Sequence, residues 1–150
     1  MRVVIQRVKH ASVSVEPDYR RAIGTGLMVL VGVEKGDTAD DAEYVARKTA
    51  ALRIFNDDAG VMNRSVIDID GELLAISQFT LLASTRKGNR PSYIRSAGGD
   101  EARALYDTYC DRLAELAGRE VKRGIFGADM AVELLNDGPV TIIIDSKLCE

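Results

Sequence analysis

Few residue types in this 150-residue chain suit conventional hydrolytic chemistry. His10 is the single histidine, and an isolated histidine in a strand-like segment is more often exposed or structural than catalytic. The sequence contains no Gly-x-Ser-x-Gly motif, no phosphate-binding loop and no dinucleotide fingerprint. Cys110 and Cys149 have neither the spacing of zinc ligands nor that of a disulfide framework. We therefore expect no metal and no cofactor.

Two polar segments remain as candidates for chemistry. Ser77-Gln78-Phe79-Thr80 lies at the end of an expected strand and offers a hydroxyl, an amide and backbone N–H groups. Gly138-Pro139 lies just before the last apolar run. By residue type alone, the first segment is also an ordinary strand end and the second an ordinary turn. Thr80 carries a nucleophilic hydroxyl, but no neighbouring base is evident to activate it.

The apolar pattern predicts how these segments are positioned. Residues 3–15 alternate as a strand does, and the continuous run 26–33 is typical of a strand buried on both faces. Asp37 or Thr38 can cap a first helix, whose apolar spacing runs to Ala50. A second helix is expected from about Asp100 to Ala117, with Gly118 as its stop.

The remaining segments read mainly as strands and loops. We expect strands over 66–69 and 72–82, joined as a hairpin by an Asp70-Gly71 turn, and a loop over 84–99. Alternation resumes after 121. The prediction is a single mixed α/β domain with roughly eight strands and two helices.

Composition limits the partners. Apolar residues make up 46% and charged residues 29% of the chain, an ordinary globular mixture, and we expect neither a signal peptide nor a membrane segment. The simplest location is cytoplasmic, with no membrane partner. A net charge of −3 argues against general nucleic-acid coating and against DNA as a partner, but allows a local RNA contact. The best basic cluster is Arg86, Lys87, Arg90 and Arg95, which is equally compatible with a solvated loop.

Five segments together resemble the D-aminoacyl-tRNA deacylase family. They are residues 1–8, the Ser77–Leu81 segment, Lys87–Ser92, Gly124–Met130 and Asn136–Thr141, in the family's order. The resemblance extends to about residue 145, so it covers nearly the whole chain. An activated aminoacyl ester beside a ribose hydroxyl also suits a chain poor in catalytic side chains, because it needs mainly hydrogen-bond donors for the developing oxyanion.

The resemblance implies an α/β fold layered as a β/β/α sandwich, and a homodimer with active sites at its interface. Ser77, Gln78, Phe79 and Thr80 would line the catalytic pocket of one subunit, with the Phe79 and Thr80 N–H groups as oxyanion donors. Gly138-Pro139, with a cis bond, would reach into that pocket from the other subunit. Arg7 would help to fix the Gly138-Pro139 loop across the dimer interface. Phe126 and Met130 would line a pocket for the terminal adenosine, or else belong to the core.

The implied activity is hydrolysis of D-aminoacyl-tRNA, and of mischarged glycyl-tRNA, with the L-aminoacyl ester rejected. The implied partner is tRNA, and Arg86, Lys87, Arg90 and Arg95 would contact its phosphates. Two alternatives remain open at this point. One is a non-catalytic tRNA-binding module, and the other is an amidohydrolase that uses Thr80 as its nucleophile.

Overall fold

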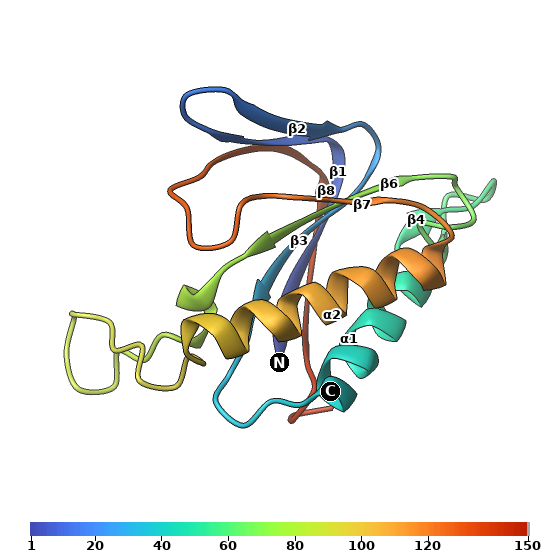
Figure 1. Ribbon diagram of the computed structural model, residues 1–150. Coiled ribbons are helices and arrows are strands. Elements are labelled where there is room, and N and C mark those ends of the chain that lie inside the picture. The colour runs from blue at the N-terminus through green and yellow to red at the C-terminus, as the bar shows by residue number, and fades with distance from the viewer. Residues whose placement is uncertain (150) are drawn as a thin grey trace.

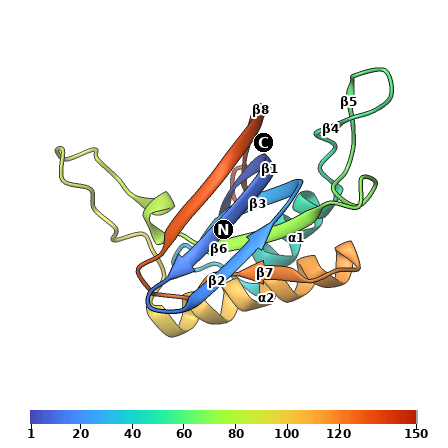
Figure 2. The same cartoon turned by 90° about the horizontal axis from the view of Figure 1, so that it is seen from above.

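The computed structural model describes residues 1–149 and consists of one curled mixed sheet with two long helices on one face (Figure 1). A small two-stranded hairpin projects from one side (Figure 2). The elements are β1 (Arg2–Val15), β2 (Tyr19–Ile23), β3 (Gly26–Gly32), α1 (Ala39–Ala51), β4 (Phe55–Asn56), β5 (Met62–Arg64), β6 (Glu72–Ser77), the 3-10 helix η1 (Phe79–Leu82), α2 (Gly99–Ala117), β7 (Val121–Arg123) and β8 (Ala131–Asp145).

The sheet is organised around β1. Its strands lie in the order β2-β1-β3-β6-β7, and β8 pairs along the other edge of β1. β1 is long enough to pair with β3 through residues 2–8 and with β2 through residues 11–15. β3 and β6 are parallel, as are β6 and β7. The C-terminal ends of β3 and β6 therefore lie side by side at one edge of the sheet. This edge positions the Ser77–Thr80 segment.

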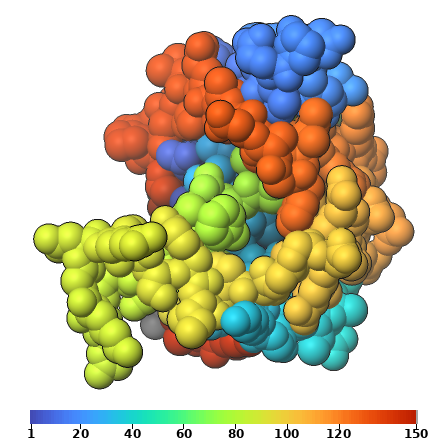
Figure 3. Space-filling model, turned by 60° about the vertical axis from the view of Figure 1, so that its left-hand side comes forward, coloured from blue at the N-terminus to red at the C-terminus, as the bar shows by residue number. Residues whose placement is uncertain are grey.

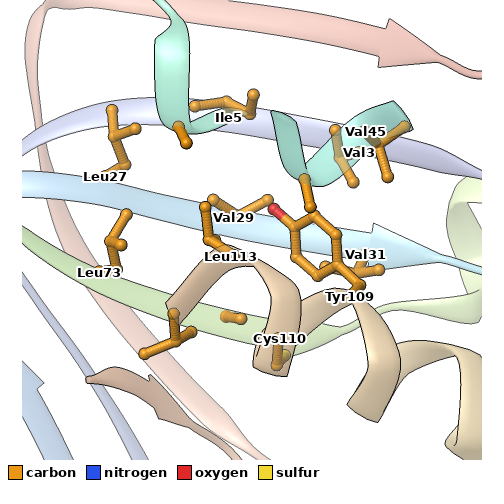
Figure 4. Packing of buried hydrophobic residues seen from close by; sticks show 14 of the residues in the cluster. Val3, Ile5, Leu27, Val29, Val31, Val45, Leu73, Tyr109, Cys110 and Leu113 are labelled. Atoms are coloured by element: carbon orange, nitrogen blue, oxygen red, sulfur yellow. The ribbon is translucent and has the colours of Figure 1, made fainter. Parts of the chain in front are cut away.

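Two apolar clusters stabilise the curled sheet. The larger one fills the space between the sheet and the helices, where Val29 and Val31 of β3 meet Tyr109 and Leu113 of α2 (Figure 4). The smaller one lies on the opposite face and includes Val13, Met28 and Ile76. Burial of apolar area on both faces of β3 explains its unbroken hydrophobic run.

The two helices and their boundaries confirm the sequence prediction. Thr38 caps α1, and the Asp41 carboxylate accepts a hydrogen bond of 2.8 Å from the Thr38 N–H, which completes a capping box. α2 ends at Gly118, whose φ of 65° is the left-handed conformation that glycine adopts without strain. Cys110 is buried within the larger cluster, as its apolar neighbours predict, and His10 is exposed on β1.

The predicted hairpin around Asp70-Gly71 is wrong. Residues 66–70 form turns, and β6 pairs with the parallel strands β3 and β7 instead of with a preceding antiparallel strand. The Gly71 N–H donates to the Val66 carbonyl over 2.9 Å, so this Asp-Gly pair closes a turn of its own. The strand predicted to Leu82 is also too long, since it ends at Ser77 and η1 follows. β2 was not predicted.

Replacing Gly26 with alanine is expected to lower the free energy of unfolding by about 3 kcal/mol. A Cβ atom at this position would lie 1.9 Å from the Glu72 carbonyl oxygen, so β3 and β6 would have to separate where they pair. Urea unfolding measures the change. Gly99→Ala is the matched control, because a Cβ there meets nothing within 4 Å, and the prediction fails if the two variants are equally stable.

No helix among residues 1–149 is both long enough and apolar enough to cross a membrane.

Candidate active site

The Ser77–Thr80 segment leaves the sheet where β6 ends. The Gln78 N–H donates to the Val31 carbonyl over 2.8 Å, which is the last sheet-like bond before the chain turns into η1. Phe79 and Thr80 open this short helix, so no preceding helical carbonyl is available to accept from their N–H groups. Two backbone donors are thereby presented side by side at the end of a rigid strand.

The side chains of this segment have different environments. The Gln78 amide Nε2 donates to the Thr80 hydroxyl oxygen over 2.5 Å. Phe79 is 56% exposed, and its ring packs edge-on against Tyr93 at a centroid distance of 5.0 Å. Ser96 Oγ donates to the Phe79 carbonyl over 3.1 Å. The loop that follows η1 therefore braces it from outside.

A pocket of about 290 Å³ opens beside this segment. Ser77, Gln78 and Phe79 line it together with Phe126 and Met130. Figure 3 shows the hollow between the segment before β8 and the N-terminal part of α2, with η1 beside it. The structure thus brings together five of the predicted site residues, whereas Thr80 is not among the residues that line the pocket.

The apolar wall of the pocket is held by packing. The rings of Tyr106 and Phe126 lie 5.9 Å apart, and the Tyr106 hydroxyl donates to the Ala75 carbonyl over 2.9 Å. Burial raises the pKa of Tyr106 far above its ordinary value, so it remains a neutral donor. Met130 packs so closely on Gly124 that an added Cβ would lie 2.4 Å from its sulfur. Phe126 and Met130 are half-buried. Each lines the pocket and also packs against one of the two apolar clusters, Phe126 against the larger and Met130 against the smaller.

Gly138 and Pro139 lie in an outward loop of β8. The pairing of β1 with β8 passes from Gln6–Thr141 to Val8–Asn136, so Arg7 alone faces the four residues 137–140. The Gly138–Pro139 peptide bond is cis, and both residues are exposed. This loop is not part of the pocket of its own chain.

Arg7 contacts the outward loop within its own chain, whereas the family resemblance implied a contact across a dimer interface. Its side chain is buried, with Nε donating to the Asp137 carbonyl over 3.0 Å and Nη1 donating to the Ile54 carbonyl over 2.7 Å. The Asp137 carboxylate lies 3.6 Å from the same Nε. The guanidinium therefore joins the outward loop to the segment that enters β4, as its planar fork of donors allows.

The predicted basic cluster divides into two parts. Arg86, Lys87 and Arg90 are exposed on a projecting loop and form no ion pair within residues 1–149 (Figures 1 and 3). Arg95 instead pairs with Glu34, with Nε and Oε1 2.8 Å apart. This hydrogen bond raises the pKa of Arg95, and the Lys35 N–H donates to the Arg95 carbonyl. Arg95 thus anchors the base of the loop.

Sequence reasoning missed Ala102, Tyr106 and Asp129 as pocket residues. Ala102 and Tyr106 belong to the apolar face of α2, and nothing in that spacing separates a pocket wall from core. Asp129 lies within a segment that carries the family resemblance, but no role was assigned to it. That this segment lines the same pocket as Ser77 depends on long-range packing.

Comparisons with known proteins identify the family of this chain. The family described as D-Tyr-tRNA(Tyr) deacylase matches residues 4–145. A D-aminoacyl-tRNA deacylase of Phocaeicola vulgatus is 56% identical over 147 residues, which cover 98% of each chain. One of Dechloromonas aromatica is 53% identical over 150 residues, the full length of both.

Solved structures are similar as well. The "c-Myc DNA Unwinding Element Binding Protein" matches with a TM-score of 0.89 and 38% identity, covering 97% of this chain and 98% of that one. A probable eukaryotic D-amino acid tRNA deacylase shares the fold, with a TM-score of 0.81 at 18% identity over 96% of this chain and 98% of that one. The chain therefore belongs to the D-Tyr-tRNA(Tyr) deacylase family and is an enzyme of the D-aminoacyl-tRNA deacylase kind.

Proposed function

We propose that residues 1–150 form one catalytic domain that works in the cytoplasm as a homodimer and proofreads aminoacyl-tRNA during translation. It hydrolyses the ester of D-aminoacyl-tRNA, and of mischarged glycyl-tRNA, to free amino acid and tRNA. The curled sheet supplies two β layers of the sandwich and the helices supply the third. Gly138-Pro139 of each subunit enters the pocket of its partner and excludes L-aminoacyl esters.

One observation carries the cross-subunit proposal. Arg7 anchors the Gly138-Pro139 loop by a hydrogen bond to the Asp137 carbonyl, yet the loop is exposed and takes no part in the pocket of its own chain. Leu135 and Ile143, on the same strand, are 47% and 64% exposed. In a two-fold dimer each surface patch meets its own copy, so an exposed loop beside exposed apolar residues fits an interface. A second copy would then complete each site.

Chiral selection follows from a rigid backbone wall. D- and L-residues differ by exchanging the hydrogen and the side chain at one carbon. The carbonyls of Gly138 and Pro139 would bind the substrate amino group and leave no room for an L side chain. Rejection by collision requires no recognition of the accepted side chain. Many D-residues are therefore expected to be substrates, and glycine, which has no side chain, is expected to enter.

Hydrolysis would proceed by attack of water on the ester carbonyl. The Phe79 and Thr80 N–H groups would stabilise the oxyanion, and preorganised donors of this kind contribute about 100-fold or more each. Gln78 would orient the water or the terminal ribose, whose own 2′-hydroxyl assists the attack. Phe126 and Met130 would hold the terminal adenosine.

Subunit complementation tests the cross-subunit site. Ala102→Phe would fill the pocket, whereas Gly138→Ala would disturb the loop, and each homodimer should be inactive. Mixed and reassociated chains should regain about one quarter of wild-type activity, since half of the dimers then contain one intact composite site. Activity that does not return, in heterodimers verified by mass spectrometry, would exclude a shared site.

Thr80→Ala is expected to retain deacylation of D-aminoacyl-tRNA within about threefold of wild type. The Thr80 hydroxyl accepts from Gln78 and does not line the pocket, so it is poorly placed as a nucleophile. Single-turnover kinetics and a search for a covalent acyl-enzyme provide the measurement. Complete loss of activity together with an acyl-enzyme in the wild type would favour the threonine amidohydrolase.

Arg90→Ala is expected to weaken tRNA binding and reduce the slope of log K against log[salt] by about one. Arg90 is exposed without an ion pair in the described chain, and its loop projects beside the pocket (Figure 3). Titrations at several salt concentrations test this, with Arg47→Ala on the outer face of α1 as the control. An unchanged slope in Arg90→Ala would remove the phosphate contact.

A further inference from the structure

We infer that Asp129 determines which base the pocket accepts, by receiving a hydrogen bond from the exocyclic amine of the terminal adenine. This inference rests on the proposed function and adds a specificity-determining residue to it.

Asp129 lines the pocket and directly follows a short turn. The Ala128 N–H donates to the Ile125 carbonyl over 3.1 Å, and Gly127 has a φ of 77°. Phe126 and Met130, on either side of this turn, pack into the wall. The position of Asp129 is therefore fixed by its neighbours in the sequence.

Asp129 is the single charged residue among those that line the pocket. Its carboxylate is exposed and has no ion pair or hydrogen bond with any residue of the described chain. The Tyr106 hydroxyl, by contrast, is occupied by Ala75. Ser77 and Gln78 belong to the segment that carries the proposed backbone donors. A solvent-exposed carboxylate that no other group of residues 1–149 occupies therefore lies among the mostly apolar residues that line the pocket.

A carboxylate accepts hydrogen bonds and cannot donate them when ionised. The 6-amino group of adenine is a donor, whereas hypoxanthine has a carbonyl oxygen at the same position, which Asp129 would repel. Cytosine also carries an amine, but its single ring would leave part of the mostly apolar pocket unfilled. A carboxylate also disfavours a phosphate, so the RNA backbone is expected to pass along the projecting loop of Arg86, Lys87 and Arg90 instead.

The test uses D-tyrosyl esters of three nucleosides: adenosine, purine riboside, which lacks the amine, and inosine, which replaces it with a carbonyl. The wild type should prefer adenosine to purine riboside by about 10-fold in kcat/KM, mainly through KM, and should react least with inosine. Asp129→Ala should show no preference between adenosine and purine riboside. Asp129→Asn can donate, so it should improve relative use of inosine. Glu120→Gln, which removes a charge at the far end of α2, should behave as the wild type.

Three outcomes would overturn the inference. They are a wild-type enzyme indifferent to the amine, an Asp129→Ala variant that keeps the full preference, and an equal loss on all three nucleosides, which would mean that Asp129 binds the ribose. Binding of the non-hydrolysable 3′-amides of the same nucleosides separates this question from catalysis. Amine-dependent binding without hydrolysis of any ester would contradict the proposed function and still support the role of Asp129.

Discussion

Gly138→Ala is expected to reduce hydrolysis of D-aminoacyl-tRNA by at least about 100-fold while the chain stays folded, because displacing a positioning group by about 1 Å can cost that much. Gly138 has a φ of 128°, which L side chains rarely adopt. An added Cβ would lie 2.8 Å from Arg7 Nη2 and 2.9 Å from Val140 Cγ2. The loop would have to move, and the proposed gate would move with it.

Gly118→Ala is the matched control for this experiment. Gly118 also has a positive φ, of 65°, but a Cβ there meets nothing within 4 Å. It should cost about 1 kcal/mol of stability and leave deacylation unchanged. Single-turnover rates and circular dichroism of both variants provide the comparison. Normal activity in Gly138→Ala would show that the position of this loop does not matter for catalysis.

Arg7→Ala is expected to lower both the free energy of unfolding, by about 3 kcal/mol, and the deacylation rate, by at least about 100-fold. The substitution leaves the Ile54 and Asp137 carbonyls without their donor and removes the support of the loop. Arg7→Lys keeps the positive charge but lacks the planar guanidinium that donates to two carbonyls at once. Compared with Arg7→Ala, it should therefore regain part of the stability and little of the activity. Chemical denaturation and steady-state kinetics measure the two losses separately.

Arg7 and Gly138 should also be coupled. Because the Cβ of Gly138→Ala would collide with the Arg7 guanidinium, the double variant should lose less than the sum of the two single losses in stability. Additive losses would mean that the collision does not determine the effect of Gly138→Ala. Unchanged stability in Arg7→Ala would contradict the role of its buried hydrogen bonds.

The parts of the fold that the sequence predicts well are those with a strong local signal. The apolar run of β3, the Thr38 cap of α1 and the Gly118 end of α2 were predicted close to their final limits. The Asp70-Gly71 hairpin failed because a turn signal does not reveal whether the next strand pairs with its neighbour or with a distant parallel strand. β2 was missed because exposed residues fill most of it.

The candidate site was predicted in part, and mainly through the family resemblance. Residue types alone do not separate Ser77–Thr80 from an ordinary strand end, nor predict that η1 would present its backbone donors. The pocket joins residues from β3, β6, α2 and the segment before β8, and only tertiary packing brings these together. No local sequence pattern predicts that Asp129 lines the pocket. The contact of Arg7 with the loop of its own chain becomes clear only from the register of β1 with β8.

The most direct test of the account is to incubate the purified protein with matched D-tyrosyl-tRNA and L-tyrosyl-tRNA and to follow release of tyrosine from each. We expect rapid loss of the D-ester while the L-ester is spared, and glycyl-tRNA should also be hydrolysed. Equal hydrolysis of the two tyrosyl esters would exclude the Gly138-Pro139 gate. Binding of tRNA without release of tyrosine from either would contradict the proposed hydrolysis itself.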